Sequence, residues 1–111
     1  QLERVFTNLV KNAVEAAAQS LSGHAQVCIH TTIGETGGAK ITIEDSGPGL
    51  GNDPIQILHS VRTTKSHGSG LGLVISRKII EAHDGLLSAS ASHQLGGAKF
   101  EITLPGQEGN I

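Results

Sequence analysis

The chain from residue 25 to residue 49 reads Ala25-Gln-Val-Cys-Ile-His-Thr-Thr-Ile33, Gly34-Glu-Thr-Gly-Gly38, Ala39-Lys-Ile-Thr-Ile-Glu44 and Asp45-Ser-Gly-Pro-Gly49. The first and third pieces are rich in β-branched side chains that alternate between two faces, which is the pattern of a strand. Two strands joined by a short glycine turn predict an antiparallel hairpin. The fourth piece is too rich in glycine to be regular, so it places Asp45 in a loop where the second strand ends.

Helical patterns and a second strand pair flank this hairpin. Apolar residues recur at helical spacing from residue 1 to 19 and again from 70 to 83, where Gly85 is the predicted C-terminal stop. Residues 86–93 and 98–104 predict two further strands around a glycine pair. The predicted order is therefore helix, two strands, loop, helix and two strands, and the loop includes a short helix over 54–60 and a polar stretch over 61–68.

Composition points to one small domain and excludes several classes of function. The 111 residues suffice for one hydrophobic core, and a formal net charge of -2 with no basic block argues against nucleic-acid binding. Phe6 and Phe100 are the only aromatic residues, which excludes a base-stacking platform. The single cysteine, Cys28, excludes an internal disulfide and a multi-cysteine zinc site. No apolar run approaches the roughly 18 residues that span a bilayer, and no signal peptide opens the chain, so we expect a soluble domain in a reducing compartment.

The first helix carries a polar stripe. Asn8, Lys11, Asn12 and Glu15 follow one another at spacings of three and four residues, so they share one face. An asparagine side-chain oxygen is a suitable ligand for Mg²⁺, which uses few protein groups. The alternative is an ordinary solvated helix face, and for this helix taken alone that alternative is favoured.

Two glycine-rich segments could bind a nucleotide. Asp45, fixed at a strand end, can accept a hydrogen bond from an exocyclic amine such as that of adenine, with glycines allowing close approach of the backbone; the alternative is a generic turn. Gly68-Ser-Gly-Leu-Gly-Leu73 opens the second long helix, whose free N–H groups suit a phosphate. Arg62 and Lys65 could add positive charge there, whereas the alternative is a surface loop. No dinucleotide fingerprint fits, because Leu73 stands where a glycine is needed, and no P-loop is present.

These segments in this order resemble the ATP-binding domain of bacterial sensor histidine kinases. That domain belongs to the GHKL ATPase superfamily, which also includes gyrase, the heat-shock chaperone of ninety kilodaltons and MutL. Asn8-Leu-Val-Lys-Asn12 looks like its N box, Asp45-Ser-Gly-Pro-Gly49 its G1 box and Gly68-Ser-Gly-Leu-Gly72 its G2 box. Thr63-Thr-Lys65 and Gly96-Gly-Ala-Lys-Phe100 are similar to the short-lid members of the nitrogen-regulation and oxygen-sensing type.

The resemblance covers residues 1–105 and implies the Bergerat fold. This fold is an α+β two-layer sandwich, with helices on one face of a mixed, mostly antiparallel sheet. The family's leading strand has no counterpart before the first helix, so we expect an N-terminally truncated catalytic domain followed by a short tail over 106–111. Two further departures are the replacement of the phenylalanine-rich F box by Ile57-Leu-His-Ser-Val61, and Ala98 where many members have a threonine near the adenine.

The resemblance also implies roles for individual residues. Asn12 would ligate Mg²⁺ bridging the ATP phosphates, Asp45 would bind the adenine amine, and Lys65 would be the phosphate partner in the lid. The implied catalytic residues are Asn8, Asn12, Glu15 and Lys65. The implied nucleotide-binding residues are Asn8, Asn12, Asp45, Gly47, Gly49, Thr64, Lys65, Gly68, Gly70, Leu71 and Gly72.

The reaction implied is transfer of the ATP γ-phosphoryl group to a histidine outside this chain. The hydrolysing members place a glutamate where this chain has Asn8, and an amide cannot accept the proton of water. All six histidines are interpreted as structural or exposed, so the acceptor would lie on a separate dimerisation domain. We therefore expect a cytoplasmic module of a homodimeric kinase that serves a response regulator, with ATP and Mg²⁺ as cofactors. Alternatives are a GHKL-type ATPase or anti-sigma serine kinase, and a degenerate interaction module without catalysis.

Overall fold

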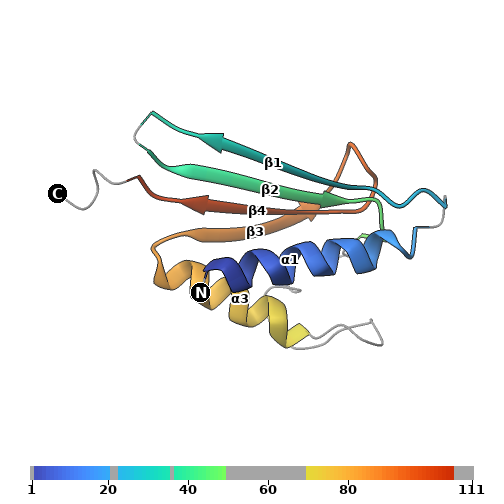
Figure 1. The fold of residues 1–111 in the computed structure, drawn as a ribbon, viewed down its shortest axis with the longest axis horizontal. Coiled ribbons are helices and arrows are strands. Elements are labelled where there is room, and N and C mark those ends of the chain that lie inside the picture. The colour runs from blue at the N-terminus through green and yellow to red at the C-terminus, as the bar shows by residue number, and fades with distance from the viewer. Residues whose placement is uncertain (1, 21–22, 36, 50–69, 107–111) are drawn as a thin grey trace.

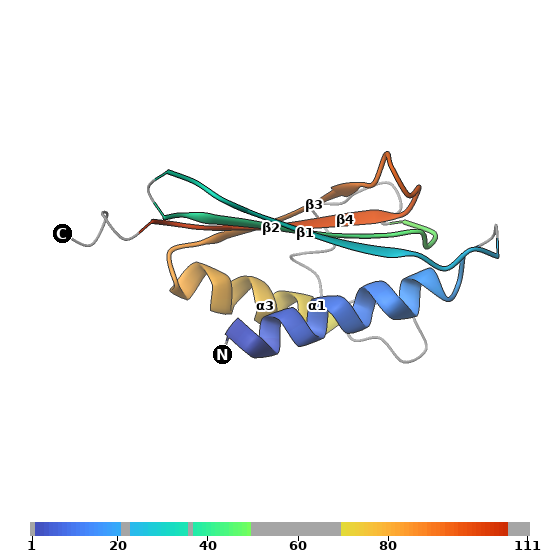
Figure 2. The same cartoon turned by 45° about the horizontal axis from the view of Figure 1, so that its top comes forward.

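In the part of the chain that the structure describes, two helices cover one face of the sheet (Figure 1). The computed structural model describes residues 2–20, 23–35, 37–49 and 70–106. Figure 2 shows both helices on the same side of the sheet, so the described part of the chain has two layers. The elements in chain order are α1 (Leu2–Ala17), β1 (Val27–Ile33), β2 (Ala39–Asp45), α3 (Gly70–Ala82), β3 (Leu86–Ala91) and β4 (Ala98–Leu104).

The four strands lie in the order β1-β2-β4-β3 and all three neighbouring pairs are antiparallel. The predicted hairpin is confirmed, since Val27 pairs with Asp45 and Ile33 with Ala39. Strand β4 lies between β2 and β3, and its Phe100 pairs with Ile43 of β2. The predicted two-layer α+β sandwich is therefore confirmed, and the strand pairing within the described residues is antiparallel throughout.

The core lies between the helices and the inner face of the two central strands. Ile41 and Ile43 on β2 alternate with polar neighbours and face Phe100 and Ile102 on β4. From the helix side, α1 contributes residues spaced four apart, as expected of one helix face. Full burial of each large aliphatic side chain stabilises the fold by about 1.5–3 kcal/mol. The buried core consists of Val5, Leu9, Ala13, Ile41, Ile43, Leu73, Ile80, Leu87, Ala98, Phe100 and Ile102.

The C-terminal end of α3 differs in one detail from the sequence prediction. The residue with left-handed backbone is Asp84 (φ 62), one position before the predicted stop at Gly85. The Asp84 N–H donates to the Glu81 carbonyl (3.0 Å) and the Gly85 N–H to the Ile80 carbonyl (2.9 Å), which is the Schellman pattern. Gly85 is instead required by packing, because a Cβ there would lie 2.7 Å from the Thr103 carbonyl oxygen.

Candidate functional site

A buried carboxylate lies where β2 ends. Asp45 has 2% of its surface exposed, and its Oδ1 accepts hydrogen bonds from the backbone N–H of Gly47 (2.9 Å) and of Ala98 (3.2 Å). No residue in the described ranges donates to its Oδ2. Burying an ionised carboxylate is costly unless its lone pairs find donors. The geometry therefore leaves one fixed acceptor oxygen at the end of the sheet.

The turn between β3 and β4 forms one wall of this carboxylate site. The Gly97 N–H donates to the Asp45 carbonyl oxygen (3.1 Å), next to the bond from Ala98. A Cβ on Gly97 would collide with both the carboxylate and the carbonyl of Asp45. Only glycine therefore lets this turn approach the aspartate so closely. Sequence reasoning treated Gly96–Gly97 as a tight turn and missed this contact.

Gly47 and Gly49, in the loop after Asp45, are each required for a different structural reason. Gly47 passes against the C-terminal half of α1, where a Cβ would collide with the Ala16 backbone. Gly49 has a φ of +90, which glycine adopts without strain. Gly47 is thus required by its packing against α1, whereas the sequence suggested that the glycines allow the backbone to approach a nucleotide.

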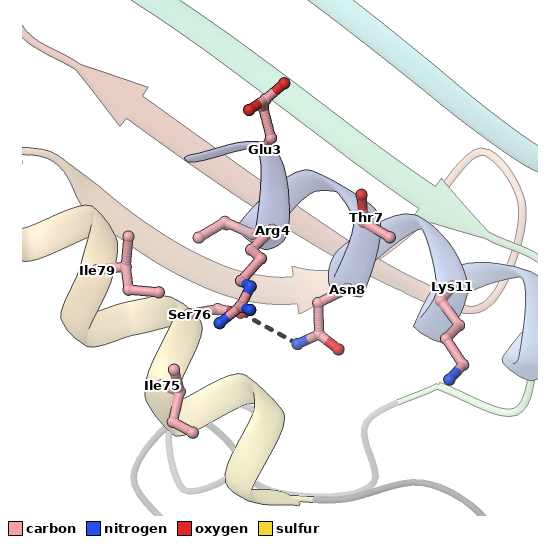
Figure 3. Close-up of a pocket in the computed structure, with 9 residues that line it drawn as sticks. Glu3, Arg4, Thr7, Asn8, Lys11, Ile75, Ser76 and Ile79 are labelled. Atoms are coloured by element: carbon pink, nitrogen blue, oxygen red, sulfur yellow. Dashed lines mark hydrogen bonds between the residues drawn. The ribbon is translucent and has the colours of Figure 1, made fainter. Parts of the chain in front are cut away.

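The polar stripe of α1 lies beside α3. Asn8, Asn12 and Glu15 are all half-buried on this helix. The Asn8 Nδ2 donates to the Ser76 hydroxyl (3.1 Å), and Ser76 is buried on α3 with 2% of its surface exposed (Figure 3). This bond joins the polar stripe of α1 to a buried serine of α3. Sequence reasoning missed Ser76, because one serine in an apolar helix gives no sign of a partner 68 residues away.

A groove of about 590 Å³ runs along α1 and α3 from this bond toward the start of α1. The Arg4 and Lys11 side chains flank Asn8 along α1, and Ile75 and Ile79 project from α3 (Figure 3). The groove is thus cationic on one wall and apolar on the other. Its lining residues are Glu3, Arg4, Val5, Thr7, Asn8, Lys11, Ile75, Ser76 and Ile79.

The N-terminal end of α3 begins at Gly70, as predicted for the glycine-rich helix start. The first N–H groups of a helix have no partner within it and carry partial positive charge, which suits an anion. This end of α3 points toward the same end of the molecule as the C-terminal ends of α1 and β2 (Figure 1). Thr64, Lys65, Gly68, the replaced F box and the short helix over 54–60 lie outside the described residues.

The acidic and imidazole side chains in the described ranges do not gather into a metal cage of three or more ligands. Mg²⁺ retains several waters and binds with one or two protein oxygens together with substrate phosphates. The amide oxygen of Asn12, which is half-buried on the polar stripe, fits this donor chemistry. The residues present are therefore compatible with Mg²⁺.

The four described histidines are exposed, as the sequence analysis expected. Two of them lie before or within β1, one follows α3 and one lies in the β3–β4 turn. His83 contacts the Ile79 carbonyl through its Nδ1 (2.8 Å). Within the described ranges no helix has both the length and the apolar composition needed to cross a membrane.

The family model "Histidine kinase-, DNA gyrase B-, and HSP90-like ATPase" matches residues 1–108 of this chain. The chain belongs to this family. The family resemblance inferred from the N-box, G1-box and G2-box segments is thereby confirmed. Its assignment to the histidine kinase type is also confirmed, since named relatives are sensor proteins and sensor histidine kinases.

Curated relatives of this ATPase domain are much longer proteins. It is 39% identical to the sensor protein FixL of Bradyrhizobium diazoefficiens over 111 residues, which are 99% of this chain and 21% of that protein. It is 38% identical to sporulation kinase A of Bacillus subtilis over 109 residues, or 95% of this chain and 16% of the relative. The chain thus spans about a fifth of the length of these relatives.

Solved structures confirm the fold assignment. The catalytic domain of the histidine kinase ThkA matches with a TM-score of 0.76 at 31% identity, covering 96% of this chain and 67% of that one. The mycobacterial sensor histidine kinase MprB matches with a TM-score of 0.75 at 29% identity, covering 94% of this chain and 69% of that one. The ATPase domain described here therefore shares its architecture with histidine kinase catalytic domains.

Proposed function

We propose that this domain binds Mg-ATP and donates the γ-phosphoryl group to a histidine on a separate dimerisation and phosphoacceptor domain. The observation that carries the proposal is the buried Asp45, whose Oδ1 is held by two backbone N–H groups while Oδ2 has no donor within the described ranges. An oxygen fixed in this way recognises a group that brings a donor. The exocyclic amine of adenine is such a group.

Recognition of the base follows from the chemistry of this oxygen. A carboxylate accepts hydrogen bonds and cannot donate when ionised, so it selects a purine with an amine at its edge over one with an oxo group. A hydrogen bond to a charged acceptor contributes about 1.5–3 kcal/mol. Gly47 and Gly49 lie in the loop that follows Asp45, and the base would lie beside this loop.

The triphosphate would extend from Asp45 toward the polar stripe of α1 and the N-terminal end of α3. The backbone N–H groups of Gly70, Leu71 and Gly72 in the first turn of α3 suit phosphate oxygens. Asn12 would hold Mg²⁺, with Asn8 and Glu15 beside it. Mg²⁺ supplies charge neutralisation for the phosphate oxygens when it is bound. Thr64, Lys65 and Gly68 retain the phosphate-binding roles that the family resemblance implies.

The residues of the stripe favour phosphotransfer over hydrolysis. Asn8 stands where the hydrolysing members have a glutamate, and its Nδ2 donates to Ser76, so this side chain cannot take a proton from water. Phosphoryl transfer depends chiefly on positioning and electrostatic stabilisation. As the bond from the γ-phosphorus to its bridging oxygen breaks, a phosphorus–nitrogen bond forms to the acceptor imidazole and ADP leaves. The imidazole proton passes to a base beside the acceptor histidine, outside this domain.

The setting of the reaction is two-component signalling in the cytoplasm. Named relatives are sensor kinases several times the length of this chain, which leaves room for an acceptor domain. We infer that the intact protein is a homodimer and that a response regulator receives its phosphoryl group. Neither nucleic acid nor direct membrane contact is part of the proposed role of this domain.

The test is transfer of γ-labelled phosphate from ATP to a separately supplied dimerisation domain of the intact protein. We expect an acid-labile, base-stable product on that domain, in the presence of Mg²⁺. The control is the same domain with its acceptor histidine replaced by glutamine. Rapid release of inorganic phosphate by this chain alone, with no labelled acceptor, would instead identify an ATPase.

A further inference from the structure

The turn between β3 and β4 is closed by Ser92. Its backbone N–H donates to the Gly97 carbonyl (2.8 Å), and its carbonyl accepts from the Gly96 N–H (2.8 Å). Its hydroxyl accepts a further bond from the Leu95 N–H (3.0 Å). Ser92 is buried, with 2% of its surface exposed. One serine thus fixes the shape of the whole turn.

The same hydroxyl also connects the turn to β2 through a hydrogen bond. The Ser92 Oγ donates to Glu44 Oε1 at 2.7 Å, a short bond to a carboxylate oxygen. Glu44 directly precedes Asp45, and their side chains point to opposite faces of the sheet because they are neighbours on one strand. The Ser92 hydroxyl therefore bonds to β2 on the face opposite to the Asp45 carboxylate.

The far end of the turn contacts Asp45 itself. The Gly97 N–H donates to the Asp45 carbonyl (3.1 Å) and the Ala98 N–H to its Oδ1 (3.2 Å). Two sets of hydrogen bonds thus hold the turn. Ser92 bonds to Glu44, and Gly97 and Ala98 bond to Asp45. If the Ser92 bond is lost, Glu44 no longer restrains the turn and the Ala98 N–H can move away from Oδ1.

We propose that Ser92 and Glu44 are positioning residues that fix the orientation of the Asp45 carboxylate, and so set the preference for a purine carrying an exocyclic amine. This inference rests on the proposed function, since it assumes that Asp45 Oδ2 accepts from the base. The effect acts on base selectivity, because the network reaches only the Asp45 end of the site. Binding contributed by the phosphates is left unchanged.

The test measures binding of ATP and of inosine triphosphate, which has an oxo group in place of the amine. For Ser92→Ala and for Glu44→Ala we expect the dissociation constant of ATP to rise about tenfold, which corresponds to about 1.4 kcal/mol. The dissociation constant of inosine triphosphate should change by less than about twofold, because it gains nothing from the aligned carboxylate. Glu44→Gln keeps an acceptor for the Ser92 hydroxyl, so it should retain the selectivity of the original chain.

Two controls separate positioning from general destabilisation. Ser46→Ala removes a hydroxyl that also makes two hydrogen bonds, to His24 and Gln26, beside Asp45 but outside the turn. It should lower stability similarly and leave selectivity intact. The double variant Ser92→Ala/Glu44→Ala should lose no more selectivity than Ser92→Ala alone, because Glu44 acts only through the Ser92 hydroxyl.

The outcomes are distinct. A loss of selectivity in both alanine variants with rescue in Glu44→Gln supports the inference. Selectivity equal to that of the original chain in Ser92→Ala, or additive losses in the double variant, would overturn it while leaving the proposed function in place. If the unaltered chain binds neither nucleotide, or binds both equally, the proposed role of Asp45 itself fails.

Discussion

The two ends of the proposed site are built differently. At the end of β2, Asp45 is almost fully buried and its Oδ1 is held by two backbone N–H groups. On the polar stripe of α1, Asn8, Asn12 and Glu15 are half-buried. Asn8 lines the groove between α1 and α3, where it makes one side-chain bond to Ser76. In the first region backbone donors fix the direction of the acceptor, whereas in the second a groove lies beside Asn8.

The difference follows from the tasks proposed for each region. Recognition of a flat base by one hydrogen bond needs an acceptor with a fixed direction, and buried backbone donors supply that direction. Phosphates and their cation carry charge, which acts over longer distances and tolerates solvent and movement. Substitutions at the Asp45 end should therefore weaken ATP binding, while those on the stripe should chiefly affect transfer.

The largest effect is expected at Asp45. Asp45→Ala removes the acceptor and leaves two buried N–H groups without a partner, so ATP affinity should fall at least about a hundredfold, or about 3 kcal/mol. Calorimetric titration measures the loss. Asp45→Asn is the matched variant, because its amide can donate to an oxo group and should shift preference toward inosine or guanosine triphosphate. Tight ATP binding by Asp45→Ala would rule out the adenine assignment.

A smaller loss of ATP affinity is expected when the β3–β4 turn is displaced from Asp45. In Gly97→Ala the new methyl group collides with the Asp45 carboxylate and carbonyl, and such overpacking costs about 1–3 kcal/mol. We expect ATP affinity to fall with stability, the latter measured by chemical unfolding. Gly96→Ala is the control, since its positive φ (+89) adds backbone strain but nothing lies within 4 Å of the added Cβ. ATP binding that weakens equally in both variants would show that strain, not the contact, matters.

On the stripe, Asn12→Asp should separate transfer from binding. The substitution keeps the size of the side chain but changes the charge beside the Mg-ATP phosphates. We expect the rate of phosphotransfer to fall about tenfold or more, which is about 1.4 kcal/mol in the barrier, with little change in the thermal unfolding midpoint. An unchanged transfer rate would remove the metal role of Asn12.

The smallest effect concerns the bond between the helices. Ser76→Ala removes the partner of the Asn8 amide, and a neutral bond of this kind contributes about 0.5–1.5 kcal/mol to stability. We expect a modest loss in chemical unfolding and nearly unchanged ATP affinity. A large drop in ATP affinity would mean that the stripe is as tightly organised as the Asp45 end.

The sequence predicted what depends on neighbouring residues. The spacing of Val5, Leu9 and Ala13 defines α1, and alternation in residues 27–33 and 39–45 defines the hairpin. The same pattern ended the second strand at Glu44 and placed Asp45 in the loop, whereas the structure has Asp45 as the last residue of β2, paired with Val27. The family resemblance identified Asp45 as a site residue. Local patterns therefore located both the fold elements and the carboxylate.

The sequence did not predict contacts made between distant segments. Gly97 lies against Asp45 because β4 pairs with β2, and no local pattern specifies this pairing. Ser92 and Glu44, 48 residues apart, meet for the same reason. At the end of α3, Asp84 takes the left-handed position, and Gly85 packs beside Thr103. These contacts depend on tertiary packing, which overrides local preference.

The most direct test of the central claim is calorimetric titration of the unaltered chain with ATP and with GTP, in the presence of Mg²⁺. We expect micromolar-to-millimolar binding of ATP and much weaker binding of GTP, because the fixed Asp45 carboxylate accepts from an amine and repels an oxo group. Equal binding of the two nucleotides, or no binding by the folded chain, would contradict it.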